Sequence, residues 1–314
     1  MAAQTDAMAP KGEKGRKRAG TWREMLRSRW AYLFVSPFYI LWLIFGLGPF
    51  LFSFYMIFAR WDGLGPIEFI GLSNFEFIFS SAGGNVFWQS LLNGVILFWM
   101  YVPIMTFLAI VLAVVLNSKR VRGFKFFRTV IFSPYVTSMI AAGFAFRLLL
   151  EQDGGLINIM LNMVGLPSVP WLETVWGARV SLCLLVIWGW LGYNMILMLA
   201  GLQTIPTELT EAAQIDGASP VQAFFHITIP LLRPMILFSV ILSVMGTFSL
   251  FNEVTALTAV PGGPMRANLT PVRHIYNIAF QDFRYGRASA MSYVYAVLIF
   301  GVSLLQMRFF GRER

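Results

Sequence analysis

Long uncharged runs of apolar residues alternate with short polar segments along this chain. A helix needs about 20 mostly apolar residues to cross the hydrocarbon core of a bilayer, which is about 30 Å thick. The runs predict six membrane-spanning helices, at roughly 31–58, 88–116, 126–149, 178–202, 234–257 and 288–309. We therefore predict an all-α, polytopic integral membrane protein.

The composition supports the same conclusion. Of the 314 residues, 57% are hydrophobic and 12% are charged, and the mean hydropathy is +0.68. These values fit poorly with a surface that is exposed to water on all sides. The first apolar segment is too long for a cleavable signal peptide and lacks a small-residue cleavage site after it, so we expect it to be retained. The single cysteine, Cys183, excludes an internal disulfide bond.

The positive charges indicate an orientation in the membrane. Eight Lys and Arg residues precede the first predicted helix, five lie between the second and third, one follows the fourth and three end the chain. The positive-inside rule places these segments in the cytoplasm, so both termini are predicted to be cytoplasmic. We interpret residues 1–29 as a basic cytoplasmic tail that attracts anionic lipid rather than nucleic acid, and residues 30–310 as the membrane domain.

The predicted cytoplasmic segment 203–233, between the fourth and fifth helices, is longer than a simple connection requires. Its local signals predict two short helices. Gly217 is a typical left-handed stop for the first, while Ser219 and Gln222 form a capping box that begins the second. Pro230 is expected to end the second helix. The residues alone leave two interpretations open: a segment that rests on its own membrane helices, or a docking element for a partner.

The order of residues in this segment resembles the EAA loop of permease subunits from binding-protein-dependent ABC importers. The resemblance is narrower to the carbohydrate-uptake branch, which includes maltose-type and glycerol-3-phosphate-type permeases. A Glu-Ala-Ala run is followed by a Gly six residues after the Glu and a Pro thirteen residues after that Gly. The positions that match, and that the resemblance implies couple to an ATPase, include Glu211, Ala212, Ala213, Asp216, Gly217, Ala218, Phe224 and Pro230.

The resemblance covers residues 30–310 and implies a type I importer permease fold in a bacterial or archaeal cytoplasmic membrane. It implies one half of a translocation path for a sugar, an oligosaccharide or a related polyol or sugar phosphate. The implied partners are a second homologous permease subunit, two ATPase subunits, an extracytoplasmic solute-binding protein and membrane lipid. ATP and Mg²⁺ would be bound by the ATPase subunits. We expect no cofactor, metal or enzymatic activity in this chain, which lacks a P-loop and has widely scattered Cys and His residues.

Polar and aromatic residues inside the fourth and fifth predicted helices are candidates for a substrate path. Aromatic rings stack on the apolar face of a sugar, while amides and hydroxyls bond its hydroxyl groups. Hydrogen bonding between helices is the alternative explanation, and Gly189 and Gly192 would allow close helix packing. In the resembling family, residues at these places contribute to the substrate site, and the candidates are Trp190, Gly192, Tyr193, Asn194, Phe248, Ser249 and Asn252.

Several charges near the predicted outer ends of the helices leave alternatives open. Phe248, Ser249 and Asn252 are expected to share one helix face, with Glu253 either in the path or solvated at the helix end. Four outer arginines could contact lipid headgroups, dock an acidic rim of a binding protein or attract an anionic substrate; they are Arg266, Arg273, Arg284 and Arg287.

Two other classes of protein compete with an ATP-driven importer. An ion-coupled secondary transporter is disfavoured because the chain shows no internal repeat and few ionisable groups inside its spans. A membrane enzyme is disfavoured because Glu253 has no second acid within the spans to act with.

Overall fold

The computed structural model of this chain describes residues 29–80, 83–118 and 122–310. Nearly all of the predicted basic tail lies outside the described residues, as do Lys119 and Arg120. The chain divides into two compact units, Met1–Tyr55 and Met56–Arg314. The described part of the first unit consists of α2 (Arg29–Trp42), a π-helical turn (Leu43–Leu47) and α3, which extends from Gly48 to Met56.

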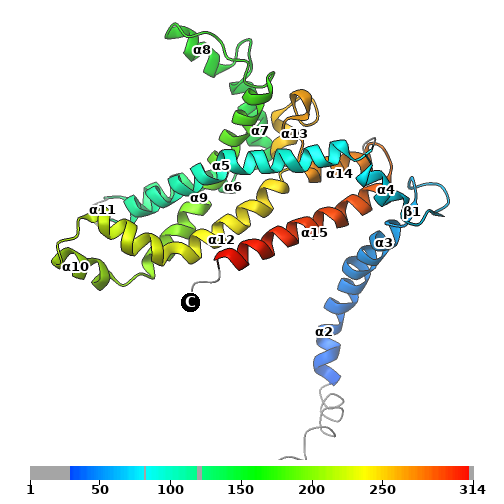
Figure 1. Cartoon of the computed structure of the whole chain (residues 1–314), viewed down its shortest axis with the longest axis horizontal. Coiled ribbons are helices and arrows are strands. Elements are labelled where there is room, and N and C mark those ends of the chain that lie inside the picture. Colours follow the sequence, from blue (N-terminus) through cyan, green and yellow to red (C-terminus); the bar gives the residue numbers. More distant parts are fainter. Residues whose placement is uncertain (1–28, 81–82, 119–121, 311–314) are drawn as a thin grey trace, which may run out of the picture. The chain divides into compact units, whose positions relative to one another are not determined.

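The second unit is almost entirely helical (Figure 1). Its one described sheet is an antiparallel pair of two-residue strands in which Ala59 faces Phe69 and Arg60 faces Glu68. The elements in chain order are β1 (Ala59–Arg60), β2 (Glu68–Phe69), α4 (Ser73–Phe79), α5 (Asn85–Asn117), α6 (Phe124–Val136), α7 (Met139–Leu149), α8 (Leu156–Met163), α9 (Val175–Gln203), α10 (Thr207–Ile215), α11 (Pro220–Ala223), a π-helical turn (Phe224–Thr228), α12 (Ile229–Phe248), α13 (Asn252–Leu257), a 3-10 turn (Pro264–Arg266), α14 (Pro271–Phe280) and α15 (Tyr285–Phe310).

Five described helical segments are long and apolar enough to cross a membrane, and a bent pair would make a sixth. The five are Trp30–Met56, Asn85–Asn117, Val175–Gln203, Pro220–Phe248 and Tyr285–Arg308. The third predicted helix, over 126–149, is not one continuous helix, because α6 and α7 meet at 95°. Thr137 and Ser138 are extended between them and follow Pro134 in the last turn of α6. An apolar run alone does not reveal such a break.

The predicted helix over 234–257 is also wrong in its bounds. Helical structure continues from α11 through Pro230 and Pro234 into α12, so Pro230 does not end a helix. The wide turn that precedes α12 lets the Ile229 N–H bond to the Phe224 carbonyl, five residues back, just before a proline that has no N–H to donate. At the other end the helix stops at Phe248, and α13 begins after a three-residue break.

Small residues allow the central helices to approach closely. Helices α5 and α9 make the most extensive helix contact in the chain, and Figure 1 shows α5, α12 and α15 running alongside one another. A Cβ on Gly192 would overlap the Ile131 carbonyl oxygen of α6, and a Cβ on Gly94 would lie 2.6 Å from the Phe248 ring. The prediction that Gly192 permits close packing is thus confirmed.

Candidate functional site

A cavity of about 400 Å³ lies among α5, α6, α9, α12 and α13. Five of the predicted path residues line it, namely Trp190, Tyr193, Asn194, Ser249 and Asn252. These last two residues flank the break after α12, because Ser249 directly follows α12 and Asn252 is the first residue of α13. The expectation that they share one helix face with Phe248 is therefore wrong.

The two remaining predicted path residues do not line this cavity. Gly192 is buried against the backbone of α6, and Phe248 is buried with its ring against Gly94 of α5. Both residues pack between helices. They therefore shape the bundle around the cavity without lining it.

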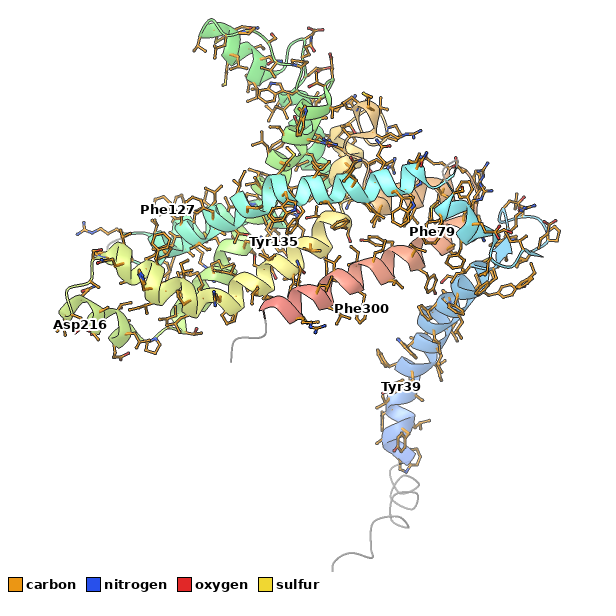
Figure 2. All side chains as sticks on the ribbon, in the orientation of Figure 1. Tyr39, Phe79, Phe127, Tyr135, Asp216 and Phe300 are labelled. Atoms are coloured by element: carbon orange, nitrogen blue, oxygen red, sulfur yellow. The ribbon has the colours of Figure 1, made fainter. Side chains whose placement is uncertain are left out.

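Three aromatic rings form one wall of the cavity. Tyr135 of α6 stacks on Tyr193 of α9 with ring centroids 5.0 Å apart, and it meets the Trp190 ring edge-on at 5.3 Å. Tyr135 lies in the middle of the helical body (Figure 2). Tyr135 is not among the residues predicted from the sequence; the polar residues around it, Ser133 and Thr137, together with the adjacent Pro134, are the signal that could have identified a break in the span there.

Hydrogen bonds between α12 and α9, and within α9, engage part of the polar lining. The Ser239 hydroxyl donates to Asn194 Oδ1 over 2.5 Å, and Asn194 Nδ2 donates to the Trp190 carbonyl over 3.0 Å. The alternative explanation, helix-to-helix bonding, therefore describes Asn194 well. Ser249 Oγ instead lies 3.3 Å from the Tyr295 hydroxyl and is exposed, as is Asn252.

Glu253 is the unexpected member of the cavity lining. Only 7% of the residue is exposed, so the interpretation as a solvated charge at a helix end is wrong. It belongs to α13, beyond the candidate spans. Burial raises the pKa of its carboxyl group, while hydrogen bonds from the backbone of Glu253 and Phe251 and from the Trp190 side chain favour the charged form.

The four outer arginines have different surroundings. Arg273 is buried, with its guanidinium carbon 5.2 Å from the centre of the Phe251 ring, so it is not available to dock a partner. Arg287 lies 3.9 Å from the centre of the Phe77 ring and is half-buried. Arg266 and Arg284 are exposed. Contact with lipid headgroups, a binding protein or an anionic substrate is therefore more accessible to Arg266 and Arg284 than to Arg273 and Arg287.

The helical hairpin formed by α10 and α11 has the predicted caps. Gly217 has φ +85°, and the Ala218 N–H bonds to the Ala213 carbonyl while the Gly217 N–H bonds to the Gln214 carbonyl. This pair of bonds is a Schellman motif. The Gln222 N–H donates to Ser219 Oγ, and the Ser219 N–H donates to Gln222 Oε1, which confirms the capping box.

The predicted coupling residues lie mostly on the surface of this hairpin. Glu211, Ala212, Asp216, Gly217 and Pro230 are exposed, while Ala213, Ala218 and Phe224 are half-buried. Asp216 occupies the tip (Figure 2). A shallow depression lies between α10 and α11, lined among others by Ala213, Gly217, Ala223 and Ile227. On its other side the hairpin is anchored, because Phe224 packs against the core formed by α5, α9 and α12.

Comparisons with known proteins agree with the fold. The sequence model of one family, described as "Binding-protein-dependent transport system inner membrane component", matches residues 78–313. A lactose transport system permease protein from Rhizobium radiobacter is 38% identical over 289 residues, which cover 90% of this chain and 94% of that protein. An arabinooligosaccharides transport system permease protein from Bacillus subtilis is 34% identical over 92% of each chain.

One solved structure has the same fold. A chain from a bacterial ABC transporter involved in the import of the acidic polysaccharide alginate has a TM-score of 0.79 and 24% identity, over 93% of this chain and 98% of that chain. At this identity the likeness concerns the fold alone.

Proposed function

Because this chain belongs to the family of binding-protein-dependent transport system inner membrane components, we propose that it couples ATP hydrolysis by partner subunits to the import of a sugar or oligosaccharide. It is a multi-pass permease of an ABC importer. The observation that carries the proposal is the match to sugar permeases over nine-tenths of the chain.

The proposed solute path is the cavity beside Trp190. Its aromatic wall offers a stacking surface, and Ser249 and Asn252 supply exposed hydrogen-bonding groups. A sugar needs both kinds of contact. The names of the two relatives, a lactose permease and an arabinooligosaccharide permease, support a carbohydrate.

The proposed contact with the ATPase is the hairpin of α10 and α11. Its caps make it rigid, its Glu211 and Asp216 are exposed, and helical structure continues from it into α12. Movement of the hairpin would therefore be transmitted to the helix that ends beside the cavity. We propose that this chain pairs with a second permease subunit, two ATPase subunits and an extracytoplasmic solute-binding protein.

Reconstitution of the complete importer in proteoliposomes tests the proposal. We expect sugar uptake to require ATP on the ATPase side together with the binding protein. Gly217→Val should lower uptake at least about tenfold without loss of membrane insertion, because a β-branched residue is strained at φ +85°. Gly217→Asn is the matched control, since Asn tolerates this backbone conformation. Uptake driven by an ion gradient alone, or wild-type uptake by Gly217→Val, would contradict the proposal.

A further inference from the structure

The cavity contains a single side chain with a formal charge. Among the described residues that line it, Glu253 is the only carboxylate, and neither Lys nor Arg is present. The other lining residues are aromatic, aliphatic, hydroxyl or amide. A carboxylate without a cation beside it gives an enclosed space a negative potential, which solvent screens less than on an open surface.

The structure fixes this carboxylate beside the aromatic wall. Glu253 follows the break between α12 and α13, and it lines the same cavity as Trp190. The same Trp190 ring meets Tyr135 at 5.3 Å. A sugar that stacks on this wall would therefore lie next to the carboxylate of Glu253.

The buried arginine that is nearest to Glu253 in sequence contacts aromatic rings. Arg273 has its guanidinium carbon 5.2 Å from the centre of the Phe251 ring and 5.5 Å from that of Tyr276. Within the described part of the chain, Glu253 forms no ion pair. Glu253 is thus a buried residue without a positive partner, a costly arrangement that a cationic group on a solute would relieve.

We propose that Glu253 selects substrates by charge, so that the cavity accepts neutral sugars and amino sugars and discriminates against sugars that carry a carboxylate. This inference rests on the proposed function, because it takes the cavity to be the sugar path. A uronic acid would bring a second negative charge next to Glu253, which is a repulsive element of specificity. The shared fold with an alginate importer does not decide this preference; the charge in the cavity does.

The test compares three small glycosides that differ in charge. Methyl β-glucoside is neutral, methyl β-glucuronide carries a carboxylate and methyl β-glucosaminide carries an ammonium group. Their binding to the purified, complete importer is measured by equilibrium dialysis of radiolabelled glycoside. For the wild type we expect the glucuronide to bind at least about tenfold more weakly than the glucoside, which corresponds to about 1.4 kcal/mol. The glucosaminide should bind at least as well as the glucoside.

The deciding variant is Glu253→Gln, which keeps the volume of the side chain and removes its charge. We expect it to bring the glucuronide and the glucoside to within about twofold of each other. Glu173→Gln is the matched control, because Glu173 is an exposed acid that does not line the cavity. It should leave the wild-type ratio unchanged.

Two results would overturn the inference: a wild-type importer that binds the glucuronide as well as the glucoside, or an equal ratio in the wild type and in Glu253→Gln. Absence of saturable binding of all three glycosides would overturn it as well. ATP-dependent uptake of sugar is measured on the same preparations. If uptake persists while the charge discrimination fails, only the charge selection is wrong; if no sugar is taken up with ATP and the binding protein, the proposed function itself fails.

Discussion

The hairpin of α10 and α11 and the loop 258–270, which is predicted to lie outside and is called the outer loop below, both contain left-handed backbone, yet they are stabilised differently. In the hairpin the stabilising bonds join residues at most five apart, such as Ala213 with Ala218. The outer loop also has local bonds, such as that from the Asn268 N–H to the Gly262 carbonyl, but distant helices add bonds to it. Asn93 Nδ2 donates to the Arg266 carbonyl over 2.7 Å, and Asn268 Nδ2 donates to the Ala178 carbonyl over 2.8 Å. The hairpin can keep its shape as it moves, whereas the outer loop depends on the surrounding bundle.

The hairpin and the outer loop also differ in backbone strain. The hairpin uses a glycine, Gly217, where a positive φ is required. The outer loop has positive φ at Gly262 and Gly263 and also at two residues with side chains, Met265 at 49° and Arg266 at 60°. Such conformations persist only where the surroundings enforce them. The exposed Met265 and Arg266 are therefore held in place by contacts made elsewhere in the chain.

The largest expected effect comes from removing the buried amide that supports the outer loop. Asn93 bonds to the carbonyls of Arg266 and Leu269 and accepts a bond from Arg179. Loss of two neutral bonds and one charge-assisted bond should lower the free energy of unfolding by about 4 kcal/mol. We predict this for Asn93→Leu, measured by denaturant unfolding in detergent. Gln89→Leu, one turn earlier in α5, removes one exposed bond to the Met265 carbonyl and should cost less than about 1 kcal/mol.

The next effect depends on pH and concerns His274 of α14, the helix that directly follows the outer loop. Burial, together with the nearby charge of Arg266, lowers the pKa of His274 to about 4, although Asp282 opposes the shift. An unfolded histidine titrates near about 6.5. Between these values the unfolded chain binds a proton that the folded chain does not. The free energy of unfolding should therefore fall as the pH falls from 7 to 4, by about 3 kcal/mol in total, and this contribution should stay constant below pH 4.

Thermal unfolding of the wild type and of His274→Gln between pH 7 and pH 4 measures this contribution. The wild type should lose more stability than the variant over that interval. His226→Gln, in the exposed helical hairpin, controls for the removal of an imidazole and should keep the wild-type slope. Equal slopes in the wild type and in His274→Gln would show that His274 contributes no such sensitivity to pH.

The smallest expected effect is confined to the hairpin. Ser219→Ala removes one half of the capping box and should cost about 1 kcal/mol. Because the bonds of the hairpin are local, we expect faster amide hydrogen exchange in residues 221–223 and little change in the unfolding of the rest of the chain. Ser219→Asp retains a capping oxygen and should exchange as the wild type does. Faster exchange throughout α5 and α9 in Ser219→Ala would contradict the local character of the hairpin.

The same contrast explains what could be predicted from the sequence. The caps at Gly217 and Ser219 depend on neighbours within a few residues, so they were predicted and are confirmed. The breaks at 137–138 and 249–251 are not predicted, although Pro134 and short polar residues accompany them, because polar residues inside a span are equally compatible with an unbroken helix. Burial of Arg273 and Glu253 depends on which helices meet, which no local pattern reveals. The roles of the hairpin and of the cavity in transport remain predictions.

The π-helical turn Phe224–Thr228 determines how the hairpin is aimed. A regular α-helix advances about 100° per residue, and a π-turn accommodates one residue more than the α-helical ladder requires. Deleting a single residue there would leave an uninterrupted helix into α12 but rotate everything before it by about 100°. The exposed acids of the hairpin would then point to a different side of the bundle. Chain length at this one turn, as much as residue identity, therefore sets the alignment between the two ends of the protein.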